Sequence, residues 1–159
     1  MATQDLKASV RSRAIGDSAI DGLLGGIVAG LIMVLFLLVV GALSSDGLAE
    51  VIRRFDPKGS GDLVTGLLTH LAVSATYGAI FGLAFLALAR LRPASVRYGW
   101  LAGLFYGLLI FAIARGAIWA GANTGLVGYS AAVLLLAHAL YGVVIGFVIG
   151  RKWGKVNEP

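Results

Sequence analysis

Long runs without a charged residue constrain this chain more than any other feature of its sequence. Residues 22–45, 63–89, 98–114 and 116–150 contain no Asp, Glu, Lys or Arg, and charged residues make up only 13% of the chain. An ordinary soluble domain is about one quarter charged, whereas about 20 consecutive apolar residues form a helix that crosses a bilayer. The sequence therefore predicts an all-α integral membrane protein rather than a soluble or disordered one.

Four transmembrane helices account for these runs. We expect them at residues 22–43, 63–88, 98–120 and 129–150, in a single four-helix domain over residues 1–159 whose first outer loop covers 44–62. The first apolar run is longer than the roughly 7 to 15 residues of a signal-peptide core. We therefore expect this helix to be retained in the membrane.

Basic residues predict the orientation of the helices. Nine of them fall on one side of the expected spans: Lys7, Arg11, Arg13, Arg90, Arg92, Arg97, Arg151, Lys152 and Lys155. The opposite side has Arg53, Arg54 and Lys58, with Arg115 near it. The positive-inside rule then places both termini in the cytoplasm. Because the cations lie at span ends, the net charge of +5 reports orientation and does not indicate nucleic-acid binding.

The first outer loop contains the pattern of a short amphipathic helix. Leu48, Val51, Ile52 and Phe55 follow one another at helical spacing, and charged residues lie between them. We expect this helix to lie on the outer membrane surface or against a partner.

Glycine recurs every fourth residue in all four expected helices. Residues four apart share a helix face, and glycine lets another backbone approach closely. Packing within the chain is the favoured role of these glycines, and contact with another chain is the alternative. The residues expected to pack helices are Gly26, Gly30, Gly78, Gly82, Gly99, Gly103, Gly107, Gly142, Gly146 and Gly150.

Two short alignments indicate an internal repeat. Placing Gly26 against Gly99 aligns GIVAGL with GWLAGL, and placing Tyr77 against Tyr141 aligns YGAIFG with YGVVIG. Both hairpins start on the same side, so we expect two parallel-repeated helical hairpins rather than inverted ones.

Two polar seams cross the expected membrane interior. His70, Ser74 and Tyr77 share one face of the second helix, and His138 and Tyr141 share one face of the fourth. Ionisable groups in a membrane are candidates for function. Neutral histidines that hydrogen-bond across helices are the favoured interpretation, and we expect no cofactor. Axial ligation of a haem or a chlorin by these histidines is the less favoured alternative.

Arg115 and Trp119 lie near the outer end of the third helix, where we expect an interfacial anchor rather than an anion site or an ion pair.

No Asp or Glu lies in the middle of a span, and the chain has no cysteine, so we expect no metal site. No arrangement of a nucleophile and a base is present, and we predict that the protein is not an enzyme.

The segments THLAVSATYGAIFG and AHALYGVVIGFVIG, together with GGIVAGLIM, carry a resemblance that covers all four expected spans. They resemble a family, a domain of unknown function, of small bacterial four-helix membrane proteins. Its motif is a histidine shortly before Tyr-Gly-x3-Gly in the second and fourth helices. The resemblance implies the fold, the association of His70 with Tyr77 and of His138 with Tyr141, and a bacterial inner membrane. It implies no activity.

Three functional hypotheses follow from the sequence. The first is a non-catalytic accessory subunit of a larger membrane complex, for example in respiratory or photosynthetic electron transfer, with the lipid bilayer and other membrane subunits as partners. The second is a small transporter or channel built around His70 and His138. The third is a haem-binding or pigment-binding subunit.

Overall fold

The computed structural model describes residues 13–44, 47–57, 61–119 and 128–155, and this part of the chain contains helices only. The four long helices are α2 (Ile15–Leu43), α4 (Leu63–Leu91), α5 (Gly99–Trp119) and α6 (Ala131–Lys155). A short helix α3 (Leu48–Arg53) follows α2, and a 3-10 helix η1 (Pro93–Tyr98) joins α4 to α5.

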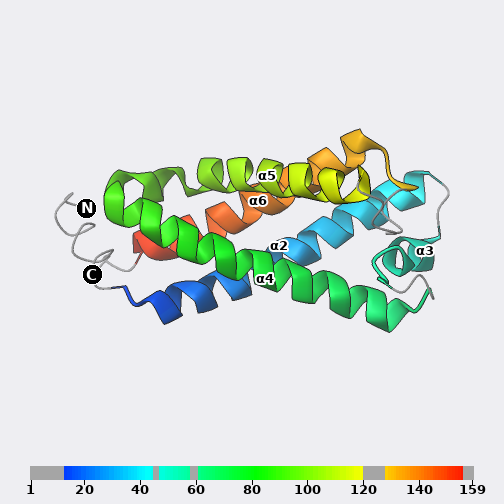
Figure 1. Cartoon of the computed structure of the whole chain (residues 1–159), viewed down its shortest axis with the longest axis horizontal. Helices are drawn as coiled ribbons and strands as arrows, with labels where there is room; N and C mark the ends of the chain where they lie inside the picture. The colour runs from blue at the N-terminus through cyan, green and yellow to red at the C-terminus, as the bar shows by residue number, and fades with distance from the viewer. Residues whose placement is uncertain (1–12, 45–46, 58–60, 120–127, 156–159) are drawn as a thin grey trace.

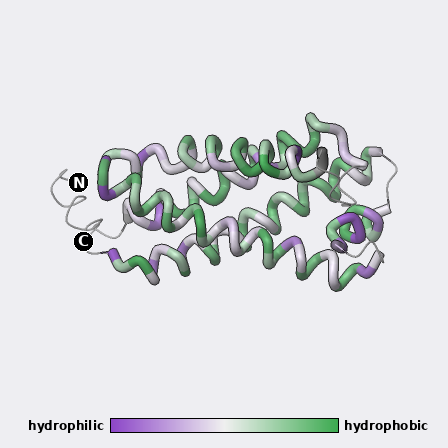
Figure 2. Tube along the Cα trace, in the orientation of Figure 1, coloured by the Kyte–Doolittle hydropathy of each residue, from purple (hydrophilic) through white to green (hydrophobic). Residues whose placement is uncertain are grey.

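The long helices alternate in direction along one bundle (Figure 1). The start of α2, the end of α6 and η1 lie at one end, here called the η1 end, and α3 lies at the opposite end, here called the α3 end. Apolar residues run along the bundle, and hydrophilic residues gather at α3 and at the helix ends (Figure 2). Among the described residues, four helices are long and apolar enough to cross a membrane. The prediction of an all-α fold is confirmed for the described residues, and the four apolar helices support a multi-pass membrane protein.

The helices are longer than the apolar runs that revealed them. α2 begins at Ile15 rather than at residue 22, α4 continues to Leu91, and α6 continues to Lys155. α4 begins where expected, because the Asp62 side chain accepts a hydrogen bond from the Thr65 amide at 2.8 Å and caps the helix. Pro93 starts η1 because proline favours the first positions of a helix. Hydropathy thus located the spans but not their polar ends.

Glycines hold the helices together in two pairs, α2 with α4 and α5 with α6. A Cβ built on Gly22 would meet the carbonyl oxygen of Gly78, and a Cβ on Gly78 would meet that of Gly22. Gly103 and Gly142 oppose each other in the same way. All ten glycines expected to pack helices lie against another helical segment of this chain. The glycine faces are therefore used inside the described bundle.

The two pairs share one pattern of contacts, but in a register that the sequence alignment did not give. Gly26 faces the carbonyl of Ser74 as Gly107 faces that of His138. If Tyr77 is matched with Tyr141, Ser74 corresponds to His138 and the contacts match Gly26 with Gly107, whereas the other alignment placed Gly26 against Gly99, about two helical turns away. The two alignments therefore do not share one packing register. Glycine every fourth residue allows several registers, and the sequence does not select among them.

α3 closes one end of the bundle. Its Val51 is fully buried, and the carbonyl of Ile52 meets the position that a Cβ on Gly66 would take. Phe55, just after α3, lies with its ring centroid 4.4 Å from that of His70. α3 is thus docked on the chain's own helices, while Leu48 of the expected apolar face remains exposed.

Candidate ligand cavity

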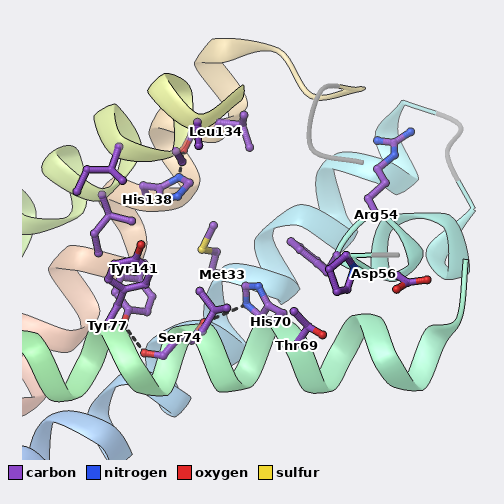
Figure 3. Close-up of a pocket in the computed structure, with 17 residues that line it drawn as sticks. Met33, Arg54, Asp56, Thr69, His70, Ser74, Tyr77, Leu134, His138 and Tyr141 are labelled. Atoms are coloured by element: carbon purple, nitrogen blue, oxygen red, sulfur yellow. Dashed lines mark hydrogen bonds between the residues drawn. The ribbon is translucent and has the colours of Figure 1, made fainter. Parts of the chain in front are cut away.

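The α3-end half of the bundle contains a cavity of about 320 Å³. Side chains from all four long helices and from the segment after α3 surround it (Figure 3). The lining residues are Met33, Arg54, Phe55, Asp56, Pro57, Thr69, His70, Val73, Ser74, Tyr77, Ile110, Ile113, Ala114, Ala117, Leu134, His138 and Tyr141. Most of this lining is apolar, which is typical of sites for small molecules.

All five residues of the two expected polar seams line this one cavity. His70, Ser74 and Tyr77 come from α4, and His138 and Tyr141 come from α6 (Figure 3). The spacing along each helix placed these side chains on one face. The packing of α4 and α6 around the same space brings the two faces together.

The hydrogen bonds of His70 determine which of its ring nitrogens carries the proton. Its Nε2 lies 3.0 Å from the backbone oxygen of Gly30 on α2. A carbonyl oxygen can only accept, so Nε2 carries the hydrogen and donates it. In the neutral ring, Nδ1 is then an acceptor, and it has no hydrogen-bond partner in the described residues.

His138 has the opposite tautomer. Its Nδ1 lies 2.7 Å from the oxygen of Leu134, one turn earlier on α6, and therefore donates to it. The Nε2 of the neutral ring is left as an acceptor, without a hydrogen-bond partner in the same described part of the chain. Each histidine of the cavity thus retains one acceptor nitrogen.

Two tyrosines connect α4 to the other pair of helices. The Tyr141 hydroxyl donates to the backbone carbonyl oxygen of Ser74 at 2.7 Å. The Tyr106 hydroxyl donates to the backbone carbonyl oxygen of Tyr77, also at 2.7 Å. Tyr106 was not among the expected site residues. Its position beside Gly107 in the middle of an apolar span was the available signal, because a buried hydroxyl requires a partner.

Polar groups also lie where the cavity approaches α3. Arg54 and the buried Asp56 contribute to the lining, and the guanidinium of Arg54 lies 4.8 Å from the ring centroid of Tyr129. From the sequence, Arg54 was expected only as one of the basic residues on the outer side. No sequence pattern indicates that the segment after α3 lies next to the polar seam residues.

A second polar cluster lies at the η1 end and was also missed. The buried Asp21 accepts hydrogen bonds from Arg13 at 3.0 Å, from Lys152 at 2.6 Å and from the Trp153 ring nitrogen at 2.9 Å. The guanidinium of Arg13 lies 4.6 Å from the Trp153 ring. The cluster ties the start of α2 to the end of α6. Its one sequence signal was an aspartate next to an apolar run, on the side rich in cations.

The expected outer-interface residues are only partly described. Arg115 lies on α5, half-buried, with no ion pair in the described ranges. Trp119 is the last residue of α5, and its side chain lies outside what the structure describes. Within the described residues, no group of three His, Asp or Glu side chains is placed to hold a metal ion.

Comparison with known protein families identifies one family to which the chain belongs. The model of a protein family of unknown function, DUF6789, matches residues 16–157. The chain belongs to DUF6789. No curated protein and no solved structure matches the chain. The match covers α2 from residue 16 onward, the other three long helices and every seam residue, so the cavity lies within the matched region.

Proposed function

We propose that the protein binds a small, largely apolar molecule with hydrogen-bond donors in the α3-end cavity, as a membrane binding protein or carrier. One observation carries the proposal: His70 and His138 each retain an acceptor nitrogen at the same apolar cavity. In a membrane, an acceptor without a partner is costly, and a donor group of a ligand satisfies it.

The cavity also supports a size and charge for the ligand. A volume of about 320 Å³ is at the lower end for small-molecule sites. The part of the lining that the long helices supply presents aliphatic side chains, hydroxyls and neutral imidazoles, and the charged lining residues Arg54 and Asp56 come from the segment after α3. This environment favours a neutral ring or short chain that carries hydroxyl, amide or aromatic amino groups over an ion.

The same geometry supports a carrier more than an open channel. The η1-end half is filled by a packed core in which Phe85 lies between Phe81 and Trp153, with ring centroids 5.4 and 5.2 Å away. Ile145 and Ile149 are buried beside them. Passage of a solute would require this half to open, whereas binding from the α3 end requires no such change.

Matched ligands and matched variants test the binding proposal. His138→Asn keeps a donor near the position of Nδ1 and removes the Nε2 acceptor, while His70→Gln keeps a donor near Nε2 and removes Nδ1. With 1-naphthol as a probe, we expect each variant to bind about three- to tenfold more weakly than the wild type, since one hydrogen bond is lost. Isothermal titration of the full chain in detergent measures this.

Two controls make the test specific. 1-Methoxynaphthalene lacks the donor, so the histidine variants should not change its affinity. Thr76→Val alters an exposed residue of α4 outside the cavity and should leave both affinities unchanged. Equal binding of both probes, or loss of binding in Thr76→Val as well, would contradict the proposal.

The accessory-subunit hypothesis is the second candidate, and a surface feature supports it. Phe105, Leu109 and Ile113 form an exposed apolar face on α5. Such a face contacts acyl chains or a helix of another subunit, for example in an electron-transfer complex. The glycines no longer support this hypothesis, because their faces are used inside the chain. Purification in mild detergent through a tag after Pro159 tests it: partners in fixed stoichiometry support it, and purification alone contradicts it.

Neither role requires catalysis or a bound cofactor, and we propose none. Haem or pigment ligation by the histidines is the minor alternative, and an absorption spectrum of the purified protein without a Soret or chlorin band would contradict it.

We further propose a bacterial inner membrane with both termini cytoplasmic, supported by the cations at the η1 end. The matching glycine contacts support two parallel-repeated helical hairpins.

A further inference from the structure

A groove at the η1 end is separate from the cavity. It has a volume of about 390 Å³ and lies between the start of α5 and the end of α6. Gly99, Gly146 and Gly150 line it, and at these glycines the two helix backbones lie close together. The missing side chains leave a hollow that Trp100 and Phe147, both exposed, border.

Two arginines line this groove. Arg97 comes from η1 and Arg151 from α6, and both are exposed. Neither forms an ion pair with a carboxylate in the described part of the chain, whereas Arg13 and Lys152 at the same end both bind Asp21. The guanidinium of Arg151 lies 5.6 Å from the Phe147 ring centroid, next to the apolar wall. Two cations without a described counter-charge therefore share an apolar groove.

The position of the groove relative to the apolar spans points to lipid. Arg97 and Trp100 lie at the start of the span Pro93–Ala117, and Arg151 lies at the end of the span Ala131–Gly154. Span ends lie at the level of the phospholipid headgroups, where tryptophan is enriched. Arginine binds phosphate through paired N–H donors.

We propose that this groove binds an anionic phospholipid, with the phosphate between Arg97 and Arg151 and an acyl chain along Trp100 and Phe147. Basic pockets between transmembrane helices recognise anionic headgroups in this way. A zwitterionic lipid offers the same acyl chain but adds a cation next to the arginines, so the groove discriminates by charge. The proposal does not depend on the α3-end cavity.

Native mass spectrometry of the full chain tests the proposal by counting lipids bound from detergent solution. We expect phosphatidylglycerol to bind more tightly than phosphatidylcholine, and Arg97→Gln with Arg151→Gln to weaken it by about thirtyfold, given the usual contribution of two juxtamembrane cations. The control, Arg53→Gln with Arg92→Gln, removes the same charge from exposed residues outside the groove and should retain the wild-type affinity.

Each outcome decides the proposal. Selective weakening of phosphatidylglycerol in the groove variant supports it. Equal affinity for both lipids, or equal weakening in the control variant, overturns it, because binding would then reflect general contact or net charge. Arg97→Gln alone keeps the test valid if the double variant does not fold, since about fivefold weaker binding is expected from one cation.

Discussion

The buried polar side chains of the bundle are satisfied mainly by backbone carbonyls. Tyr141 and Tyr106 donate to carbonyls of α4, His70 donates to one of α2, and His138 donates within its own helix. A helical carbonyl has a second lone pair, so it accepts these bonds without losing its bond in the helix. The chain therefore places polar residues in its interior without charged partners in mid-span.

Tyr141→Phe tests one of these bonds. Removing the hydroxyl leaves the Ser74 carbonyl with its helical bond only, so we expect the free energy of unfolding to fall by about 0.5 to 1.5 kcal/mol. Tyr98→Phe, at an exposed tyrosine of η1, should change it little. Unfolding in mixed detergent micelles measures both, and equal effects of the two changes would show that the bond contributes nothing.

Asp62 makes the cap of α4 sensitive to pH. Hydrogen bonds from the hydroxyl and amide of Thr65 hold the pKa of Asp62 below its ordinary value. The ionised carboxylate is thus favoured by folding, and its contribution is present above the unfolded pKa and lost as pH falls through the lower folded one. We expect Asp62→Asn, which caps without titrating, to reduce the fall in melting temperature between pH 5 and pH 3. An unchanged pH profile would contradict this.

At the scale of the elements, the glycine pairs determine how closely helices approach. A Cβ on Gly103 would lie closer than 3.0 Å to backbone atoms of Gly142 and Gly146, which cannot rotate away. Gly103→Ala should therefore separate α5 from α6 and cost about 1 to 3 kcal/mol or more. Gly116→Ala lies on the same helix with nothing within 4 Å and should be neutral or slightly stabilising. Thermal unfolding of both variants is the measurement, and similar melting temperatures would rule out the close contact.

Asp21 connects two elements that are distant in the sequence, α2 and α6. Asp21→Asn removes the charge that binds Arg13 and Lys152, and we expect a loss of about 1.5 to 3 kcal/mol, as for hydrogen bonds to charged groups. Asp17→Asn, one turn earlier and exposed, serves as the control. Limited proteolysis at the η1 end should accelerate only in Asp21→Asn. Equal rates in both variants would show that the cluster does not hold this end.

For the whole molecule, the four long helices alternate in direction, so we expect the η1 end and the α3 end on opposite sides of the membrane. The chain has no cysteine, so single introduced cysteines report orientation directly. We expect an impermeant maleimide to label Leu48→Cys in intact cells and Arg92→Cys only after permeabilisation. Labelling of both from outside would contradict the arrangement of the spans, and the reverse pattern would contradict the orientation.

The two halves of the molecule differ in how completely they are packed. The η1-end half is filled by Phe81, Phe85 and Trp153, and its outer groove lies between helices that glycines hold together. The α3-end half contains the cavity, which Phe55 and its neighbours after α3 help to line. Ligand exchange is therefore expected at the α3 end, because the packed aromatic core fills the η1-end half.

The sequence by itself determined the number, order and approximate position of the spans. Their free energy of transfer depends on the composition of about 20 consecutive residues, so it can be read locally. It also determined which residues of α4 and of α6 share a face, because helical periodicity fixes that spacing. His70, Ser74 and Tyr77 were predicted together for this reason, as were His138 and Tyr141.

Only the tertiary structure decided which faces meet. Helical periodicity identifies which residues share a face but not which other helix that face contacts. The sequence therefore did not predict that the two seams meet at one cavity, that the Tyr106 hydroxyl donates to a carbonyl of α4, or that Lys152 binds Asp21. Register was degenerate for the same reason: glycine every fourth residue fits equally well after a slip of two turns. The packing of whole helices, through every contact along their length, pairs Gly26 with Ser74 and Gly107 with His138.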